Sequence, residues 1–154
     1  MTMDAASFRP DELAHDLLSQ NAYLTLATAD GDGTPWACPV WFAARDLEEF
    51  VWASKPGARH SRNIAERSRV SLVVFDSSRE PGEGSALYVA AEAAAVDDAA
   101  FAHALEIYNE RSRERGLAEW TSAKLHEPAK HRLYTARTLE AFVLDDHDER
   151  VRVR

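Results

Sequence analysis

The hairpin that decides the fold occupies residues 23–43, which read YLTLATADGDGTPWACPVWFA. Residues 23–28 and 36–43 are rich in apolar and β-forming side chains, so each half predicts a strand. Between them, Asp30-Gly31-Asp32-Gly33 supplies residues that adopt the left-handed backbone conformations of a tight turn. The stretch therefore predicts two antiparallel strands joined by a hairpin.

The chain around this hairpin predicts more strands than helices. Proline and acids in residues 9–12, followed by leucines at 13, 17 and 18, indicate a helix over about 10–21. Further strands are expected at 50–53, 70–75, 86–96, 133–136 and 139–144, helices at 58–67 and 97–115, and a helical turn at 120–125. We expect a single mainly β domain of the α+β class over 1–154, with its barrel at about 22–144 and a charged tail at 145–154.

Composition limits the classes of function. The chain has 154 residues and a net charge of −8, which disfavours nucleic-acid binding. No apolar run reaches the roughly 18 residues needed to span a bilayer, and Met1 to Pro10 lacks the features of a secretory signal. The single cysteine, Cys38, has no charged neighbours and fits inert packing in a reducing compartment. We therefore expect a cytoplasmic protein that binds neither nucleic acid nor membrane.

One short segment is basic although the chain as a whole is acidic. Between Lys55 and Arg69 there are five Lys or Arg and one His against a single acid, Glu66. A helix start favours acids because its free N–H groups and dipole are positive, yet here it carries Arg59 and His60. This inversion suits a bound anion such as a phosphate. The residues alone leave phosphate binding and a solvated basic face as equal alternatives.

Aromatic residues lie close to this segment in the predicted strands. Trp36, Trp41 and Trp52 fall on neighbouring strands and provide either a flat wall for a planar ring or part of the core. The spacing of the histidines does not suggest a metal site, and no Ser/His/Asp set suggests a catalytic nucleophile. We therefore expect a bound ligand, rather than a side chain of the protein, to carry out any catalytic chemistry.

Nine short motifs follow one another between about residues 20 and 144. They are 23–28 with the hairpin turn, Pro39–Phe42, Trp52–Ser54, His60–Ile64, Arg69–Leu72, Phe75–Ser77, Pro81–Gly84, Leu87–Val89 and Arg132–Tyr134. In this order and spacing they resemble the pyridoxamine 5′-phosphate oxidase-like FMN-binding split-barrel family. The resemblance implies a six-stranded antiparallel split β-barrel that forms a homodimer, with FMN held in a groove between the subunits.

The resemblance also implies roles for particular residues. Those expected to line the flavin ring are Pro39, Val40 and Trp41. Those expected beside the ribityl chain are Trp52, Ala53, Ser54 and Lys55. Those expected at the phosphate are Arg59, His60 and Ser61, while Asn63 is expected to tie the helix to a neighbouring loop. Tyr88 and Trp120 are candidates for the substrate side of the ring because they are aromatic.

Two departures from the family pattern keep alternatives open. Relatives commonly carry Arg or Lys two residues apart at the helix start, where this chain has Ala58 and His60 with Arg59 between them. Both FMN and a deazaflavin cofactor are compatible with this set. The chain also lacks the long C-terminal region of true pyridoxamine 5′-phosphate oxidases, so that activity is not expected. The expected function is an FMN-binding oxidoreductase of unknown substrate; the alternatives are a deazaflavin-dependent reductase and a non-catalytic flavin- or haem-binding module.

Overall fold

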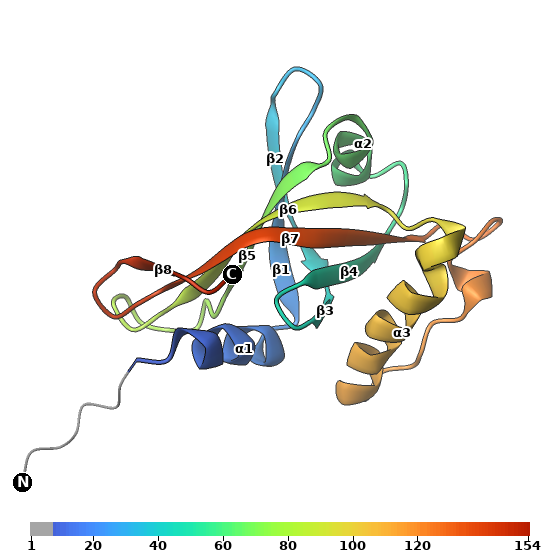
Figure 1. Cartoon of the computed structure of the whole chain (residues 1–154). Coiled ribbons are helices and arrows are strands. Elements are labelled where there is room, and N and C mark those ends of the chain that lie inside the picture. The colour runs from blue at the N-terminus through green and yellow to red at the C-terminus, as the bar shows by residue number, and fades with distance from the viewer. Residues whose placement is uncertain (1–7) are drawn as a thin grey trace, which may run out of the picture.

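The computed structural model describes residues 8–154, which form one curled sheet and three α-helices (Figure 1). The helices are α1 (Pro10–Gln20), α2 (Arg59–Glu66) and α3 (Asp98–Glu114), with a 3₁₀ turn at Ser122–Lys124. The strands are β1 (Tyr23–Ala29), β2 (Pro35–Trp41), β3 (Ala43–Arg45), β4 (Glu49–Ser54), β5 (Arg69–Phe75), β6 (Ala86–Ala95), β7 (Arg132–Leu144) and β8 (Arg150–Arg152). None of the helices in this range is both long and apolar enough to cross a bilayer.

The sheet is antiparallel throughout and curls into a split barrel. Its strand order is β2-β1-β5-β6-β7-β4-β3, with β8 beside β7. β2 and β3 stand at opposite ends of this order, yet only Phe42 separates them along the chain. One bent segment therefore supplies both edges and draws them together. The expected mainly β, α+β split-barrel fold is confirmed.

The strands differ from the sequence prediction in two places. The expected strand over 36–43 breaks at Phe42, because its first part pairs with β1 and its second with β4. The two expected closing strands are one strand, β7, in which Leu139 is an extra residue: Ala90 pairs with Glu140, but Ala91 pairs with Thr138. Such a bulge interrupts the alternation that identifies a strand in a sequence.

The expected charged tail is partly ordered. The Asp145 carboxylate accepts hydrogen bonds from the backbone N–H groups of His147 and Glu149, at 2.8 Å each, and so forms a turn. After it, β8 pairs with the end of β7. Charged side chains hid this strand in the sequence, because they remain exposed or half-buried at the sheet edge.

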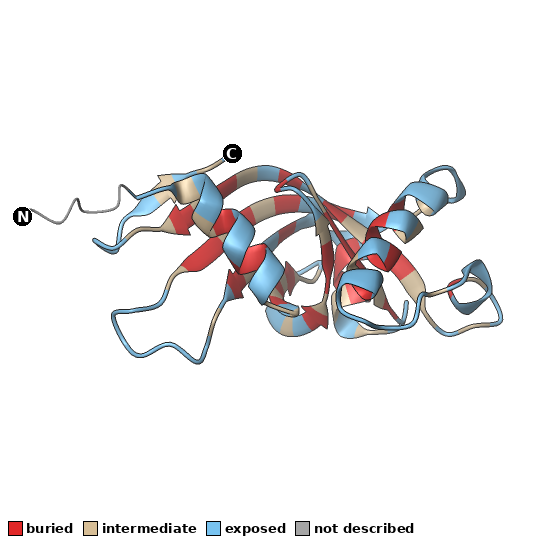
Figure 2. Cartoon of the chain, turned by 90° about the horizontal axis from the view of Figure 1, so that it is seen from below, coloured by how far each residue is buried: buried red, intermediate tan, exposed pale blue. Residues whose placement is uncertain are grey.

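Two apolar cores hold the fold together. The larger fills the barrel, and Figure 2 shows the buried residues recurring along its strands. Its largest fully buried side chains are Trp52, Phe42, Phe50, Leu24, Leu26, Leu72 and Leu87. Each such side chain stabilises the fold by roughly 1.5–3 kcal/mol through burial. The smaller core joins α3 to β3, β4 and β7 through residues such as Ile107, Tyr108, Leu125 and Leu133.

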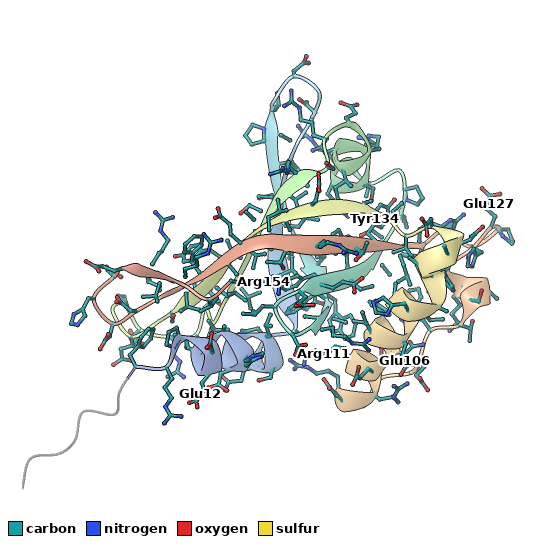
Figure 3. The ribbon with its side chains drawn as sticks, in the orientation of Figure 1. Glu12, Glu106, Arg111, Glu127, Tyr134 and Arg154 are labelled. Atoms are coloured by element: carbon teal, nitrogen blue, oxygen red, sulfur yellow. The ribbon has the colours of Figure 1, made fainter. Side chains whose placement is uncertain are left out.

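The helices lie at different ends of the barrel. α2 sits beside the β1–β2 hairpin, whereas α1 and α3 flank the opposite end (Figure 1). Arg111 of α3 is labelled where the two helices approach each other (Figure 3), and its guanidinium donates to the carbonyl oxygens of Leu18 and Asn21 at 2.8 and 3.0 Å. Arg115 adds a bond to the carbonyl oxygen of Ser19 at 2.9 Å. These bonds satisfy carbonyl groups at the C-terminal end of α1 that have no partner within the helix.

Candidate functional site

The start of α2 is the point where the basic segment becomes structured. β4 ends at Ser54, and the Ala58 N–H donates to the Lys55 carbonyl at 3.0 Å in the turn that follows. Ala58 then precedes α2 in an extended conformation, with no side chain capping the helix and no acid in its first turn. The positive end of the helix dipole and its first N–H groups are therefore not neutralised by a side chain.

Three cations surround this helix start. Lys55, Arg59 and Arg62 are exposed, and within residues 8–154 none of them forms an ion pair with a carboxylate. Arg62 donates instead to the carbonyl oxygen of Gly57. The chain has eight more acids than bases, so leaving these cations without carboxylates indicates a local preference for an external anion.

Ser61 lies in the first turn of α2 and is buried, with 3% of its surface exposed. Its hydroxyl has no hydrogen-bond partner among the described residues. A buried polar group without a partner costs about 1–3 kcal/mol. The hydroxyl is therefore an unsatisfied buried donor in the first turn of α2, the turn that also carries Arg59.

His60 is held by two side chains from different strands. Its Nε2 lies 2.8 Å from the Ser54 hydroxyl on β4, and its Nδ1 lies 3.3 Å from the Cys38 sulfur on β2. Burial lowers the pKa of His60, so the ring is neutral at pH 7. Burial also raises the pKa of Cys38, which therefore remains a thiol. Arg59, rather than His60, is thus the charged partner for an anion at the first turn.

Cys38 is the site residue that the sequence analysis missed. We expected it to be inert packing, but it is half-buried and orients the His60 ring. The alternation of β2 was the available signal, because it places Trp36, Cys38 and Val40 on one side of the strand. Which helix that side faces depends on the closure of the barrel and is not encoded locally.

Other contacts anchor α2 to the hairpin. The Asn63 amide donates to the Thr28 hydroxyl at 3.0 Å, and both residues are buried. Its partner is thus a residue of β1 rather than the expected loop. The Glu66 carboxylate accepts from the Gly31 N–H at 2.6 Å, and Arg67 donates to the Gly31 carbonyl at 2.7 Å. The last turn of α2 is therefore fixed by the protein itself.

The structure buries two of the apolar side chains expected to contact the cofactor. Val40 is 7% exposed and Trp52 is 0% exposed, and both belong to the barrel core. The Trp52 ring stacks on Tyr134 with 6.1 Å between ring centroids. Both side chains point inward because of strand alternation. A ligand outside the barrel has access only to their backbone.

The remaining predicted residues fall into separate regions. Pro39 is exposed, while Trp41 is half-buried and packs edge-on against Tyr108 at 5.1 Å between ring centroids. Tyr108 also contacts Trp120 at 5.9 Å, so Trp41 and Trp120 belong to one aromatic cluster beside α3. Burial raises the pKa of Tyr108 to about 12, which keeps its hydroxyl protonated. Ala53 packs against the same cluster.

Tyr88 lies elsewhere, on the outer face of β6. The guanidinium carbon of Arg150 lies 5.9 Å from the centroid of its ring. The two residues expected on the substrate side, Tyr88 and Trp120, are therefore not brought together within one chain. A cleft of about 570 Å³ between α1 and α3 contains neither of them and none of the other predicted site residues.

The family model described as pyridoxamine 5′-phosphate oxidase matches residues 10–142 of the chain. The chain belongs to this family. No curated protein matches the sequence significantly.

Solved structures share the fold of this family member. A heme binding protein from Mycobacterium smegmatis superposes with a TM-score of 0.72 at 19% identity; the match covers 95% of this chain but only 59% of that protein. The heme storage protein HutZ from Vibrio cholerae gives a TM-score of 0.66 at 19% identity, covering 88% of this chain and 95% of its own. An F420 reductase gives 0.57 at 25% identity, covering 82% and 94%.

This family member also carries an apolar outer sheet face. Pairing register places Pro39, Thr25, Val73, Tyr88 and Phe142 in one row across five strands. Beside this row, Tyr23 and Phe75 are 60% and 49% exposed. Large exposed apolar patches usually mark interaction surfaces. The face therefore has the character of an interface rather than of ordinary solvent-exposed sheet.

Proposed function

We propose that the chain binds the phosphate of FMN at the start of α2 and works as a flavin-dependent oxidoreductase. The observation that carries this proposal is the uncapped first turn of α2. There Arg59, which forms no ion pair within residues 8–154, occurs together with the Ser61 hydroxyl, which has no hydrogen-bond partner among those residues. A phosphate supplies several acceptor oxygens and two negative charges, and would satisfy both groups at once.

The residues fit such a cofactor in a definite way. Arg59 and the first N–H groups of α2 would hold the phosphate, with Lys55 providing further positive charge and Ser61 a hydroxyl donor. Pro39 and Trp41 would border the flavin ring on the outer side of β2. The flavin supplies the redox chemistry, and the protein binds, orients and shields it. No side chain of this chain needs to act as a nucleophile.

The proposal includes a homodimer. The apolar outer face, with Tyr23, Val73 and Phe75 at its centre, is the surface that a second copy would cover. A cofactor that meets Pro39 on this face would then lie at the subunit interface. A reducing compartment such as the cytoplasm suits the Cys38 thiol, since it would remain free to orient His60.

Two alternatives share this site. A deazaflavin reductase is supported by the 25% identity with the F420 reductase. The phosphate of its cofactor would meet the same cations at the start of α2. A non-catalytic flavin or haem carrier uses the same fold and differs in having no turnover.

The first experiment identifies the ligand. Protein from its native host is purified, and the absorbance spectrum and mass of any co-purifying molecule are measured. Flavin bands support the proposal, whereas a Soret band or the deazaflavin band selects one of the alternatives. Colourless protein that fails to bind FMN or a deazaflavin at micromolar concentration contradicts the proposal.

The second experiment tests the assigned residue. Arg59→Ala should weaken FMN binding by roughly 10- to 100-fold, since hydrogen bonds to charged groups contribute about 1.5–3 kcal/mol. Arg69→Ala is the matched control, because Arg69 is also exposed but lies on β5 near Glu92. Equal losses of FMN affinity in both variants would show only a general effect of charge.

A third experiment distinguishes an enzyme from a carrier. Reduction of the bound flavin by NAD(P)H or a reduced deazaflavin is followed by stopped flow, and only an enzyme should show a fast reductive phase.

A further inference from the structure

Trp36 differs from the other tryptophans in its exposure. It is 40% exposed, whereas Trp52 is fully buried and Trp41 and Trp120 are half-buried. Its indole is nevertheless held in place, because the guanidinium carbon of Arg59 lies 4.4 Å from the centroid of its ring. The exposed indole of Trp36 is thus held against the guanidinium of Arg59.

Arg59 connects this indole to the phosphate site. It is the first residue of α2, so the side chain that stacks on Trp36 begins at the positive end of the helix. Trp36 also faces α2, on the side of β2 opposite to Pro39 and Trp41. An anion held by Arg59 would therefore lie beside the Trp36 ring, on the side of β2 that faces α2.

A guanidinium stacked on an indole forms a platform for a further planar ring. Both groups favour stacking, and neither demands a particular hydrogen-bonding pattern from its partner. Base stacking on an aromatic side chain contributes about 1–3 kcal/mol per base. The basic surroundings favour a ring that carries a phosphate, because Lys55 and Arg62 are exposed and form no ion pair with a carboxylate within residues 8–154.

We infer that Trp36 and Arg59 form a stacking subsite for the adenine ring of a nucleotide whose phosphate reaches the start of α2. The inference extends the proposed function, because the adenylate lies next to the phosphate of the flavin. The adenylate has two chemical sources: the second half of FAD, or a separate adenine nucleotide that binds beside FMN. In both cases the stacking ring is adenine and the recognising pair is the same.

The test uses calorimetric titration of the full chain with FMN, FAD and 5′-AMP, the last with and without saturating FMN. FAD should bind roughly tenfold more tightly than FMN, or 5′-AMP should bind the FMN-loaded protein; the two results assign the adenylate to one cofactor or to a second nucleotide. Trp36→Ala should reduce the adenine-dependent affinity roughly tenfold and leave FMN binding within about twofold. Trp36→Phe, which keeps a stacking ring, should fall between these values.

Leu117→Ala is the control, since Leu117 is 53% exposed and lies beyond the end of α3. It should change none of the affinities. The inference is overturned if neither FAD nor 5′-AMP shows an adenine-dependent gain, or if Trp36→Ala weakens FMN and FAD equally. Equal weakening would mean that Trp36 merely supports Arg59. If FMN does not bind but 5′-AMP binds and requires Trp36, the proposed flavin function fails while the adenine subsite stands.

Discussion

The starts of α2 and α3 are the same kind of structure with opposite chemistry. At α3, the Asp97 carboxylate accepts a hydrogen bond from the Ala100 N–H at 2.9 Å, and Asp98 follows in the first turn. At α2, the corresponding residue is Ala58, and the first turn carries Arg59 and His60 without an acid. The chain completes the start of α3 from its own residues. The start of α2 has no such carboxylate, and there we propose that an external anion binds.

Arginines show the same contrast. The guanidinium of Arg111 donates hydrogen bonds to carbonyl oxygens at the end of α1. Burial, together with the nearby Arg115, lowers the pKa of Arg111. Arg59 donates to no carbonyl or carboxylate among residues 8–154 and rests on Trp36 instead. A cation committed to the backbone is structural, whereas an uncommitted cation at a helix start is available to a ligand. The contrast thus distinguishes a structural contact between two helices from the proposed binding site.

Giving α2 the cap that α3 has should produce the largest effect. Ala58 already has the extended conformation of a capping residue, so Ala58→Asp should raise the free energy of unfolding by about 1 kcal/mol. The same carboxylate should repel the phosphate and lower FMN affinity roughly 30-fold. Calorimetry and thermal unfolding measure the two quantities. Ala65→Asp, which adds the same charge late in α2, should change FMN affinity little. An equal loss of affinity in this variant would show that the position at the helix start is not important for binding.

The Ser61 hydroxyl should have the next largest effect. Ser61→Ala should lower FMN affinity roughly tenfold, because a donor to a charged oxygen is lost. The ligand-free protein should keep its stability or gain less than about 1 kcal/mol, since the variant removes a buried polar group that lacks a partner. Urea unfolding of the ligand-free protein provides the second measurement. A large loss of stability with unchanged affinity would make the hydroxyl structural.

Removing the cap of α3 should affect stability alone. Asp97→Ala should lower the free energy of unfolding by about 1 kcal/mol, because the Ala100 N–H loses its acceptor. FMN affinity should stay unchanged, because α2 packs chiefly against β1, β2 and β6 rather than against α3. Asp98→Ala, at a fully exposed neighbouring position that makes no cap, is the control. A fall in FMN affinity with Asp97→Ala would contradict the assignment of a purely structural role to the start of α3.

The smallest effect concerns the charge of His60. Burial lowers the pKa of His60, so the ligand-free protein resists its protonation and loses stability as the pH falls below the ordinary value of about 6.5. A bound phosphate favours the protonated ring, so affinity should rise as the pH falls through the same range. Between about pH 8 and pH 5.5 the affinity of the wild type relative to His60→Gln should rise roughly two- to fivefold. This ratio cancels the titration of FMN itself, and a flat ratio would exclude His60 from the site.

Sequence reasoning located the strands, α2 and its cations, because each depends on neighbouring residues. It failed where distant segments decide the outcome. The break at Phe42 follows from two different pairing partners, and the burial of Trp52 follows from which side of β4 faces the barrel interior. β8 was not predicted, because it is short and charged and pairs only with the end of β7.

The sequence by itself determined a helix start that carries cations and lacks an acid, because charge and capping are properties of adjacent residues. Only the tertiary structure decided what surrounds that start. Closure of the barrel brings Cys38 of β2 and Ser54 of β4 to either side of the His60 ring and places Trp36 over Arg59. Strand register and barrel curvature set these contacts between segments that are far apart in sequence, so no local pattern encodes them.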